Sequence, residues 1–188
     1  MNIQNSARLS YEFMSSKDAE LFYELDQDTE VMRYINGGRM TPFESIHSTF
    51  IPRLEKYSNQ AKGWGLWKVS LTMLDKAVQV PFLGWILVRP MDFFTDTPQW
   101  DNLEIGWRFK QIAWGKGYAT EAAQAVIAVV TQEPHLNVIS AIALEENLGS
   151  INIMKKLGMT FLKTECVDDS FVEGRVVYYQ KSLSVRLL

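Results

Sequence analysis

The sequence predicts one α/β domain over residues 1–188, with helices on both faces of a mixed β-sheet. Segments with the pattern of strands, in which polar and apolar residues alternate or all residues are apolar, are interspersed with segments of helical periodicity. Val138 to Leu144 is almost wholly apolar, as is typical of a central strand covered on both faces. The length of 188 residues and the apolar content of 47% suit a single compact domain with a substantial core.

The N-terminal third is predicted to be one strand followed by helices. Alternation of polar and apolar residues predicts the strand at Arg8 to Phe13. Helical spacing predicts a helix from Ser16 to Gln27 and a short helical piece from Thr29 to Ile35, after which Asn36-Gly37-Gly38-Arg39 forms a turn. Thr41-Pro42-Phe43-Glu44 matches a capping box with proline at the first helical position, so we expect a helix from Pro42 to about Tyr57.

The middle of the chain is predicted to be mostly strand. Trp64 to Leu74 and Phe82 to Val88 are predicted strands joined by a turn near Asp75-Lys76. Asp92 to Asp101 is a polar and aromatic loop, and Leu103 to Phe109 is the next strand.

The C-terminal third is predicted to alternate between helices and strands. Apolar residues at helical spacing predict a long helix from Ala119 to Val130, before the strand at Val138. Ser150 to Leu157 is a short helix that Gly158 ends. Met159 to Glu165 and Val176 to Ser182 are predicted closing strands on either side of an acidic loop.

Two glycines separated by one residue, Gly115 and Gly117, stand between the Leu103 strand and the long helix. Glycine lets the backbone approach a ligand closely, and a helix start offers unpaired amides and the positive end of a dipole. Together these features predict a phosphate-binding loop. The segment fits neither a Walker A loop, because Gly117 follows Lys116, nor a Rossmann fingerprint, because Thr120 stands where the third glycine belongs. A glycine-rich turn that only caps the helix is the alternative.

Composition excludes several functional classes. A net charge of −3 argues against a nucleic-acid-binding protein, and no apolar run approaches the roughly 20 residues that span a membrane. One cysteine, Cys166, cannot form an internal disulfide, and two histidines without metal-ligand spacing predict no metal site. With a polar start that lacks a secretory pattern, these features predict a cytoplasmic protein. The sequence leaves open whether it is a monomer or a homodimer.

Three segments, in order and at matching separations, resemble the GNAT N-acetyltransferase superfamily over most of the chain. In that family a loop of the form Q/R-x-x-G-x-G/A binds the pyrophosphate of acetyl-CoA. Trp114-x-x-Gly117-x-Ala119 fits this form except at its first position. The variant WGKGYATEA is similar to the RimJ/RimL branch, which acetylates N-terminal amines of ribosomal proteins and has many members acting on other amines. The segments DTEVMRYI (28–35) and NLGSINIMKKLGM (147–159) also look like segments of this branch.

The resemblance implies a GNAT-like fold: a mixed, mostly antiparallel sheet whose central strand pair, at Leu103 and Val138, splays apart. The splay would free backbone groups for the pantetheine amides of acetyl-CoA, the cosubstrate. One backbone N–H there would polarise the thioester carbonyl. The residues expected to bind the cosubstrate are Ile105, Trp107, Phe109, Trp114, Gly115, Lys116, Gly117, Tyr118, Ala119, Thr120, Asn147 and Ser150. For Asn147, a turn former is the alternative reading.

The resemblance also suggests catalytic residues for acetyl transfer to a primary amine by direct attack in a ternary complex. Glu104 is the candidate base; a salt-bridged strand carboxylate is the alternative. Ser150 is the candidate acid for the leaving thiolate; a helix N-cap is the alternative, and both roles can coexist. The tyrosine acid that many family members have four positions later is replaced by Met154.

The acceptor is expected to be an amine, either a protein N-terminus or a small molecule. Three loops, 36–40, 92–101 and 168–173, are expected to rim its groove. Acidic residues in the last two would suit a cationic amine; the alternative is that they are ordinary solvated surface charge. A CoA-binding sensor without turnover is the alternative function.

Overall fold

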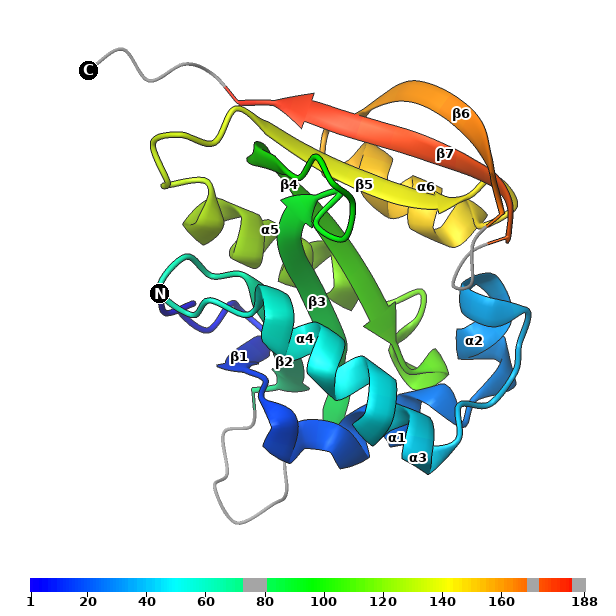
Figure 1. The fold of residues 1–188 in the computed structure, drawn as a ribbon. Coiled ribbons are helices and arrows are strands. Elements are labelled where there is room, and N and C mark those ends of the chain that lie inside the picture. The colour runs from blue at the N-terminus through cyan, green and yellow to red at the C-terminus, as the bar shows by residue number, and fades with distance from the viewer. Residues whose placement is uncertain (73–80, 169–172, 184–188) are drawn as a thin grey trace.

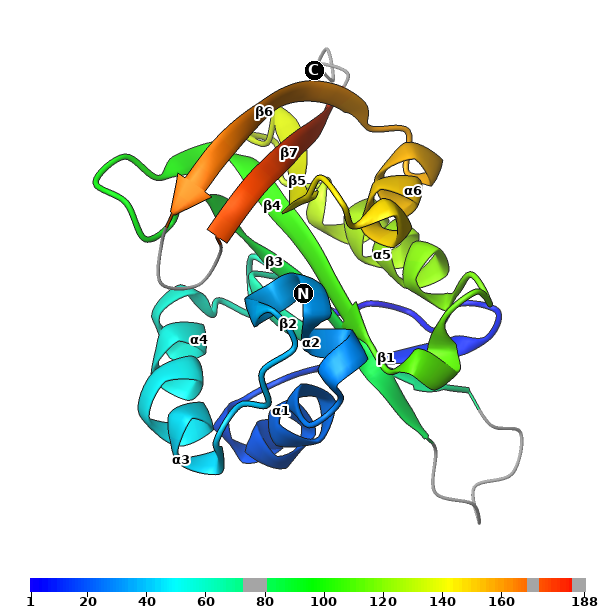
Figure 2. The ribbon, with the colours of Figure 1, turned by 90° about the vertical axis from the view of Figure 1, so that its right-hand side faces the viewer.

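The computed structural model describes residues 1–72, 81–168 and 173–183, and Figures 1 and 2 show it from two directions. Within these residues the strands are β1 (Leu9–Phe13), β2 (Gly65–Leu71), β3 (Phe82–Met91), β4 (Gln99–Phe109), β5 (Val138–Leu144), β6 (Thr160–Asp168) and β7 (Glu173–Ser182). The helices are α1 (Ala19–Asp26), α2 (Thr29–Asn36), α3 (Phe43–Ser45), α4 (Ile51–Tyr57), α5 (Tyr118–Val130) and α6 (Leu148–Lys156), with helical turns η1 (Ser16–Asp18), η2 (Ile46–Phe50) and η3 (Gln111–Ala113). No helix in this part of the chain combines the length and apolar character that crossing a membrane requires.

The strands form one sheet in the order β1-β2-β3-β4-β5-β7-β6. All neighbours are antiparallel except β4 and β5, which run parallel. The predicted mixed, mostly antiparallel sheet is therefore confirmed.

The central strands β4 and β5 separate along their length. They pair only from Asn102 with Val138 to Glu104 with Ser140, although β4 continues to Phe109 and β5 to Leu144. Figures 1 and 2 show the two strands diverging beyond this short contact. The predicted splay is confirmed, and it begins at Glu104.

Helices cover both faces of the sheet, as predicted (Figure 2). Alternate residues of β3 enter the two layers. Ile86 belongs to the buried cluster that includes Val126 of α5, whereas Trp85 belongs to the cluster that includes Phe22 of α1 and Leu54 of α4. The helix after the glycine loop thus packs on one face, and the N-terminal helices pack on the other.

The predicted capping box at Thr41 is wrong. The Thr41 hydroxyl donates a 2.7 Å hydrogen bond to Oδ2 of buried Asp26, and Pro42 caps α3 without a side-chain bond. A tertiary partner therefore outcompetes the local cap. The expected single helix to Tyr57 is divided into α3, the π-helical turn η2 and α4.

Several other boundaries differ from the predictions. β4 begins at Gln99, which shortens the expected 92–101 loop, and α6 begins at Leu148 rather than Ser150. β6 and β7 extend further than expected, to Asp168 and Glu173. The turn near Asp75-Lys76, the end of the strand predicted to reach Leu74 and the centre of the acidic loop lie outside the described residues.

Candidate active site

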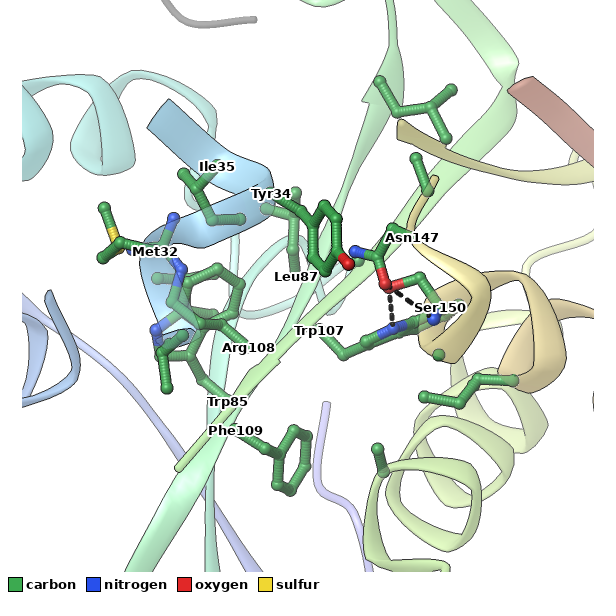
Figure 3. Close-up of a pocket in the computed structure, with 18 of the residues that line it drawn as sticks. Met32, Tyr34, Ile35, Trp85, Leu87, Trp107, Arg108, Phe109, Asn147 and Ser150 are labelled. Carbon is green, nitrogen blue, oxygen red and sulfur yellow. Dashed lines mark hydrogen bonds between the residues drawn. The ribbon is translucent and has the colours of Figure 1, made fainter. Parts of the chain in front are cut away.

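A cavity of about 1020 Å³ lies where β4 and β5 separate. Its walls come from α2, α4, β3, β4, the glycine loop, the end of β5 and the start of α6. Figure 3 shows Trp107, Asn147 and Ser150 gathered on one side of β4, and Trp85 and Arg108 on the side of α2. All of the sequence-predicted site residues line this cavity except Lys116.

The glycine loop depends on two left-handed residues. Gly115 has φ +72° and Gly117, the N-cap of α5, has φ +78°. A Cβ atom added at Gly115 would meet nothing within 4 Å, and one at Gly117 would meet only Nη2 of Arg8, at 3.6 Å. Both glycines are therefore required by backbone conformation rather than by crowding from protein atoms.

The loop presents a run of free amides at the start of α5. No backbone N–H from Gly115 to Thr120 makes a well-formed hydrogen bond to a residue that the structure describes. The next amide, that of Glu121, closes the first helical turn on the Gly117 carbonyl at 3.0 Å. Consecutive free amides at the positive end of a 13-residue helix suit the diphosphate of CoA, so the loop fits this cosubstrate.

Arg8 and Glu121 hold this loop in place, a feature that the sequence analysis missed. The Arg8 guanidinium pairs with Glu121 at 2.7 Å, donates to the Lys116 carbonyl at 3.0 Å and lies 4.5 Å from the centre of the Tyr118 ring. Ser6 also donates to Glu121, at 2.7 Å. Desolvation opposes ionisation of Glu121, but the hydrogen bonds from Ser6 and Arg8 prevail and lower its pKa. Thus the segment that leads into β1 is tied to the start of α5.

Three cross-strand pairs of β3 and β4 form one face of the site. Arg89 faces Glu104, Leu87 faces Gly106, and Trp85 faces Arg108. Glu104 is buried, with 6% exposure, and its Oε2 accepts a 2.7 Å bond from Nε of Arg89. Burial disfavours the charged form of Arg89, but the Glu104 carboxylate raises its pKa. The candidate base is therefore a salt-bridged carboxylate on the cavity wall.

A second buried ion pair lies at the other end of this face. Arg108 pairs with Asp26, which also accepts from Thr41, and its guanidinium lies 4.9 Å from the Trp85 ring centre. Nε of Arg108 and Nε1 of Trp85 are buried without a hydrogen-bond partner among the described residues. The pair with Asp26 joins the N-terminal helices to β4.

The start of α6 supplies the polar groups on the other side of β4. Asn147 is the N-cap: its Oδ1 accepts from the Ser150 amide at 3.0 Å. The N-cap role considered for Ser150 is therefore wrong. The Ser150 hydroxyl instead accepts a 3.1 Å bond from Nε1 of Trp107, which leaves its own proton available to another acceptor. Met154 is fully buried in the core.

The acidic rim expected around the acceptor groove is wrong for the described residues. Asp92, Asp96 and Asp101 do not line the cavity, because the β3–β4 connection lies at the paired end of β4 rather than at its splayed end. Asp169 lies outside the described residues, as do the side chains of its neighbours 168 and 170–173. The charged lining residues are Glu30, Glu104, Arg39, Arg53, Arg89, Arg108 and Lys156. The loop at 36–40 does border the cavity, as predicted.

Comparisons with known proteins identify the family of this chain. Residues 8–160 match the acetyltransferase (GNAT) domain family. The chain is 31% identical over 159 residues to an uncharacterized N-acetyltransferase, YnaD, of Bacillus subtilis, with 85% of this chain and 82% of that protein covered. A GNAT-family acetyltransferase structure from Bacillus anthracis superposes with a TM-score of 0.72 at 27% identity, covering 97% of this chain and 98% of that one.

Two further structures, both solved with coenzyme A, share the fold at lower identity. The aminoglycoside acetyltransferase AAC(6')-Ib has a TM-score of 0.73 at 15% identity, with 94% of this chain and 96% of that one covered. RimL, the ribosomal L7/L12 α-N-protein acetyltransferase, has a TM-score of 0.71 at 10% identity, with 97% and 98% covered. RimL is thus one of several similar neighbours, and the RimJ/RimL branch stays a prediction. The chain belongs to the GNAT acetyltransferase family and is an N-acetyltransferase whose cosubstrate is acetyl-CoA.

Proposed function

We propose that the chain moves the acetyl group of acetyl-CoA to a primary amine by direct attack in a ternary complex. One observation carries this proposal: a single cavity contains the free amides ahead of α5, the Glu104 carboxylate and the Ser150 hydroxyl. The first group suits a diphosphate, and the other two suit the proton transfers that amide formation needs.

The glycine loop would bind the cosubstrate. Backbone amides from Gly115 to Thr120 would donate to the diphosphate, each charge-assisted bond contributing about 1.5–3 kcal/mol. The side chain of Lys116 is exposed and does not line the cavity, so this residue would act through its backbone. Backbone groups of β4 from Ile105 to Phe109, which do not pair with β5, would bind the pantetheine arm and polarise the thioester carbonyl. Asn147 would contact the same arm.

Glu104 would take the proton that the amine must lose, directly or through one water. An α-amine, with a pKa of about 7.7–8.0, gives up this proton more readily near neutral pH than a lysine amine at about 10.4. The bond from Arg89 fixes one carboxylate oxygen and leaves the other oxygen as acceptor. The salt bridge and the catalytic role are therefore compatible.

Ser150 would supply the proton that the leaving sulfur needs. The new C–N bond forms as the C–S bond breaks. The hydroxyl proton passes to the thiolate, the amine proton leaves through Glu104 to solvent, and the serine oxygen regains a proton from solvent water. The indole of Trp107 donates to Ser150 Oγ, which orients the hydroxyl and stabilises negative charge on its oxygen. Met154 cannot take this role because its side chain has no proton to give.

The acceptor would be either a protein N-terminus, as in the RimJ/RimL branch, or a small-molecule amine. The named neighbours include an enzyme of each kind, an aminoglycoside acetyltransferase and a ribosomal-protein acetyltransferase. A panel of peptides and small amines, offered with labelled acetyl-CoA and followed by acetyl incorporation and free-CoA release, tests the proposal. Transfer to at least one amine is expected. Tight binding of acetyl-CoA without transfer to any amine would favour a CoA-binding sensor instead.

A further inference from the structure

Five aromatic side chains form a continuous row beside the cavity, which we call the aromatic ladder: Tyr57, Phe94, Phe93, Trp100 and Trp64. Tyr57 contacts both Phe94 and Phe93, with ring centres 6.1 and 5.9 Å away, and the ring centres of Phe94 and Phe93 are 5.1 Å apart. Phe93 lies 6.2 Å from Trp100, which is stacked on Trp64 at 5.9 Å. These are the spacings of contacting aromatic pairs.

The ladder begins at the candidate base. Arg89, which binds Glu104, lies 5.9 Å from the Tyr57 ring centre and 5.6 Å from that of Phe94. Tyr57 and Arg89 both line the cavity, whereas Phe94 and Trp100 do not. The row therefore leads from the reacting end of the site to the surface outside it.

The outer part of the ladder is open to solvent. Trp100 is 58% exposed and Phe94 is 38% exposed, among the largest exposed apolar side chains in the described residues. The guanidinium of Arg53 lies 3.8 Å from the Phe94 ring centre, and the Lys62 amine lies 4.5 Å from that of Trp64. Aromatic residues and arginine are the types enriched where proteins bind other polypeptides, and an exposed apolar patch is typical of such a surface.

We propose that the acetyl acceptor is a polypeptide, whose N-terminal amine reaches Glu104 and whose following residues lie along the aromatic ladder. This inference rests on the proposed function. From Arg89 through Phe94, Phe93 and Trp100 to Trp64, the path has four steps of 5.1 to 6.2 Å. At about 3.3 Å per extended residue it accommodates at most roughly seven residues. A small amine held inside the cavity would not reach Trp100.

Peptides of two, four and eight residues with the same N-terminal residues provide the test. We expect kcat/KM for free-CoA release to rise at least tenfold from the dipeptide to the octapeptide. Trp100→Ala should lower the octapeptide value about tenfold and remove most of its advantage over the dipeptide. Phe161→Ala removes an aromatic side chain of similar exposure, 56%, from β6 and serves as the matched control. It should keep the length dependence of the wild type.

Three results would overturn the inference. Transfer that is independent of peptide length would leave the proposed function intact and remove the ladder as a binding surface. A loss in Trp100→Ala that is equal for all peptides, together with a change of oligomeric state in light scattering, would show that the ladder binds a second copy of the chain. No transfer to any amine would remove the proposed function and this inference together.

Discussion

Replacing Gly117 by alanine tests whether the backbone of the glycine loop holds the cosubstrate. Gly117 has φ +78°, which costs an alanine about 1–2 kcal/mol. The new Cβ would meet only Nη2 of Arg8 at 3.6 Å, an ordinary contact, so crowding adds little. If the loop keeps its conformation, the protein loses that stability and still binds acetyl-CoA. If the loop relaxes towards negative φ, the amides ahead of α5 change direction.

Among the described residues, the bond from Arg8 to the Lys116 carbonyl and the bond from Trp114 to the Phe109 carbonyl restrain the loop from outside. Neither bond is made by Gly117, so we expect relaxation at this residue. The loss of one charge-assisted N–H to phosphate bond costs about 1.5–3 kcal/mol. At about 1.4 kcal/mol per factor of ten, the Kd of acetyl-CoA should rise about 10- to 150-fold. Titration calorimetry measures this change, and urea unfolding measures stability in parallel.

Gly158→Ala is the matched control. Gly158 has φ +75°, and an added Cβ there would meet only the end of the Lys181 side chain, with Nζ at 3.5 Å and Cε at 3.9 Å. The residue does not line the cavity. It should lose about 1–2 kcal/mol of stability and keep its affinity for acetyl-CoA. Equal loss of stability in both variants with unchanged affinity in both would refute the role given to the loop amides.

Other predictions concern the chemistry and pH. Glu104→Gln should lower kcat about 10²- to 10⁴-fold with little change in acetyl-CoA affinity. The substitution leaves the largely buried Arg89 without its counter-charge, so the free energy of unfolding must be measured in parallel. Turnover equal to that of the wild type would show that Glu104 is only the structural partner of Arg89. In single-turnover kinetics, Ser150→Ala should slow the chemical step, and Trp107→Phe should slow it less. A rate for Ser150→Ala equal to that of the wild type would remove the serine from the mechanism. Burial raises the pKa of Tyr57 to about 12, from about 10 when unfolded. The unfolded chain therefore holds fewer protons between these values, and up to about 3 kcal/mol of stability is lost as pH rises from 10 to 12. Tyr57→Phe should reduce this loss in unfolding measured across that range. Part of the loss should remain because the pKa of Tyr178 is also raised to about 12, and a loss as steep as that of the wild type would contradict the assignment.

The regular elements could be predicted because their signals are local. The apolar stripe of α5 and the apolar run of β5 both fold as their periodicity indicates. Predictions that depended on a competing tertiary contact were wrong. Thr41 has the sequence of a cap, but its hydroxyl bonds to Asp26, fifteen residues earlier. Propensity at a single position is a weak guide when a buried partner is available.

Cavity-lining residues that belong to one continuous motif could be named from the sequence, whereas contacts between distant segments were missed. The glycine loop, its helix start and Asn147 are read from neighbouring residues. The Arg8–Glu121 pair joins residues 113 positions apart, and nothing near Arg8 in the sequence indicates it. The pairing of Arg89 with Glu104 depends on the register of β3 and β4, which a one-residue slip would abolish. The expected acidic rim was wrong for the same reason, since Asp92, Asp96 and Asp101 do not line the cavity, although Phe94 of the same loop lies beside Arg89.

Trp114 bears on the proposal that the backbone of the glycine loop, rather than a side chain, binds the cosubstrate. In the family form Q/R-x-x-G-x-G/A, the side chain of the first residue has N–H groups that can donate hydrogen bonds to a phosphate. Trp114 has a single donor, and its Nε1 is already used on the Phe109 carbonyl at 2.8 Å. This bond links the end of β4 to the loop while the ring stays about half exposed, at 48%. Among the described residues, the Trp114 side chain therefore has no free donor for a phosphate and instead links the loop to β4. If the amides from Gly115 to Thr120 bind the diphosphate, as proposed, a change in their direction should be more damaging here than in a chain with Gln or Arg at this position.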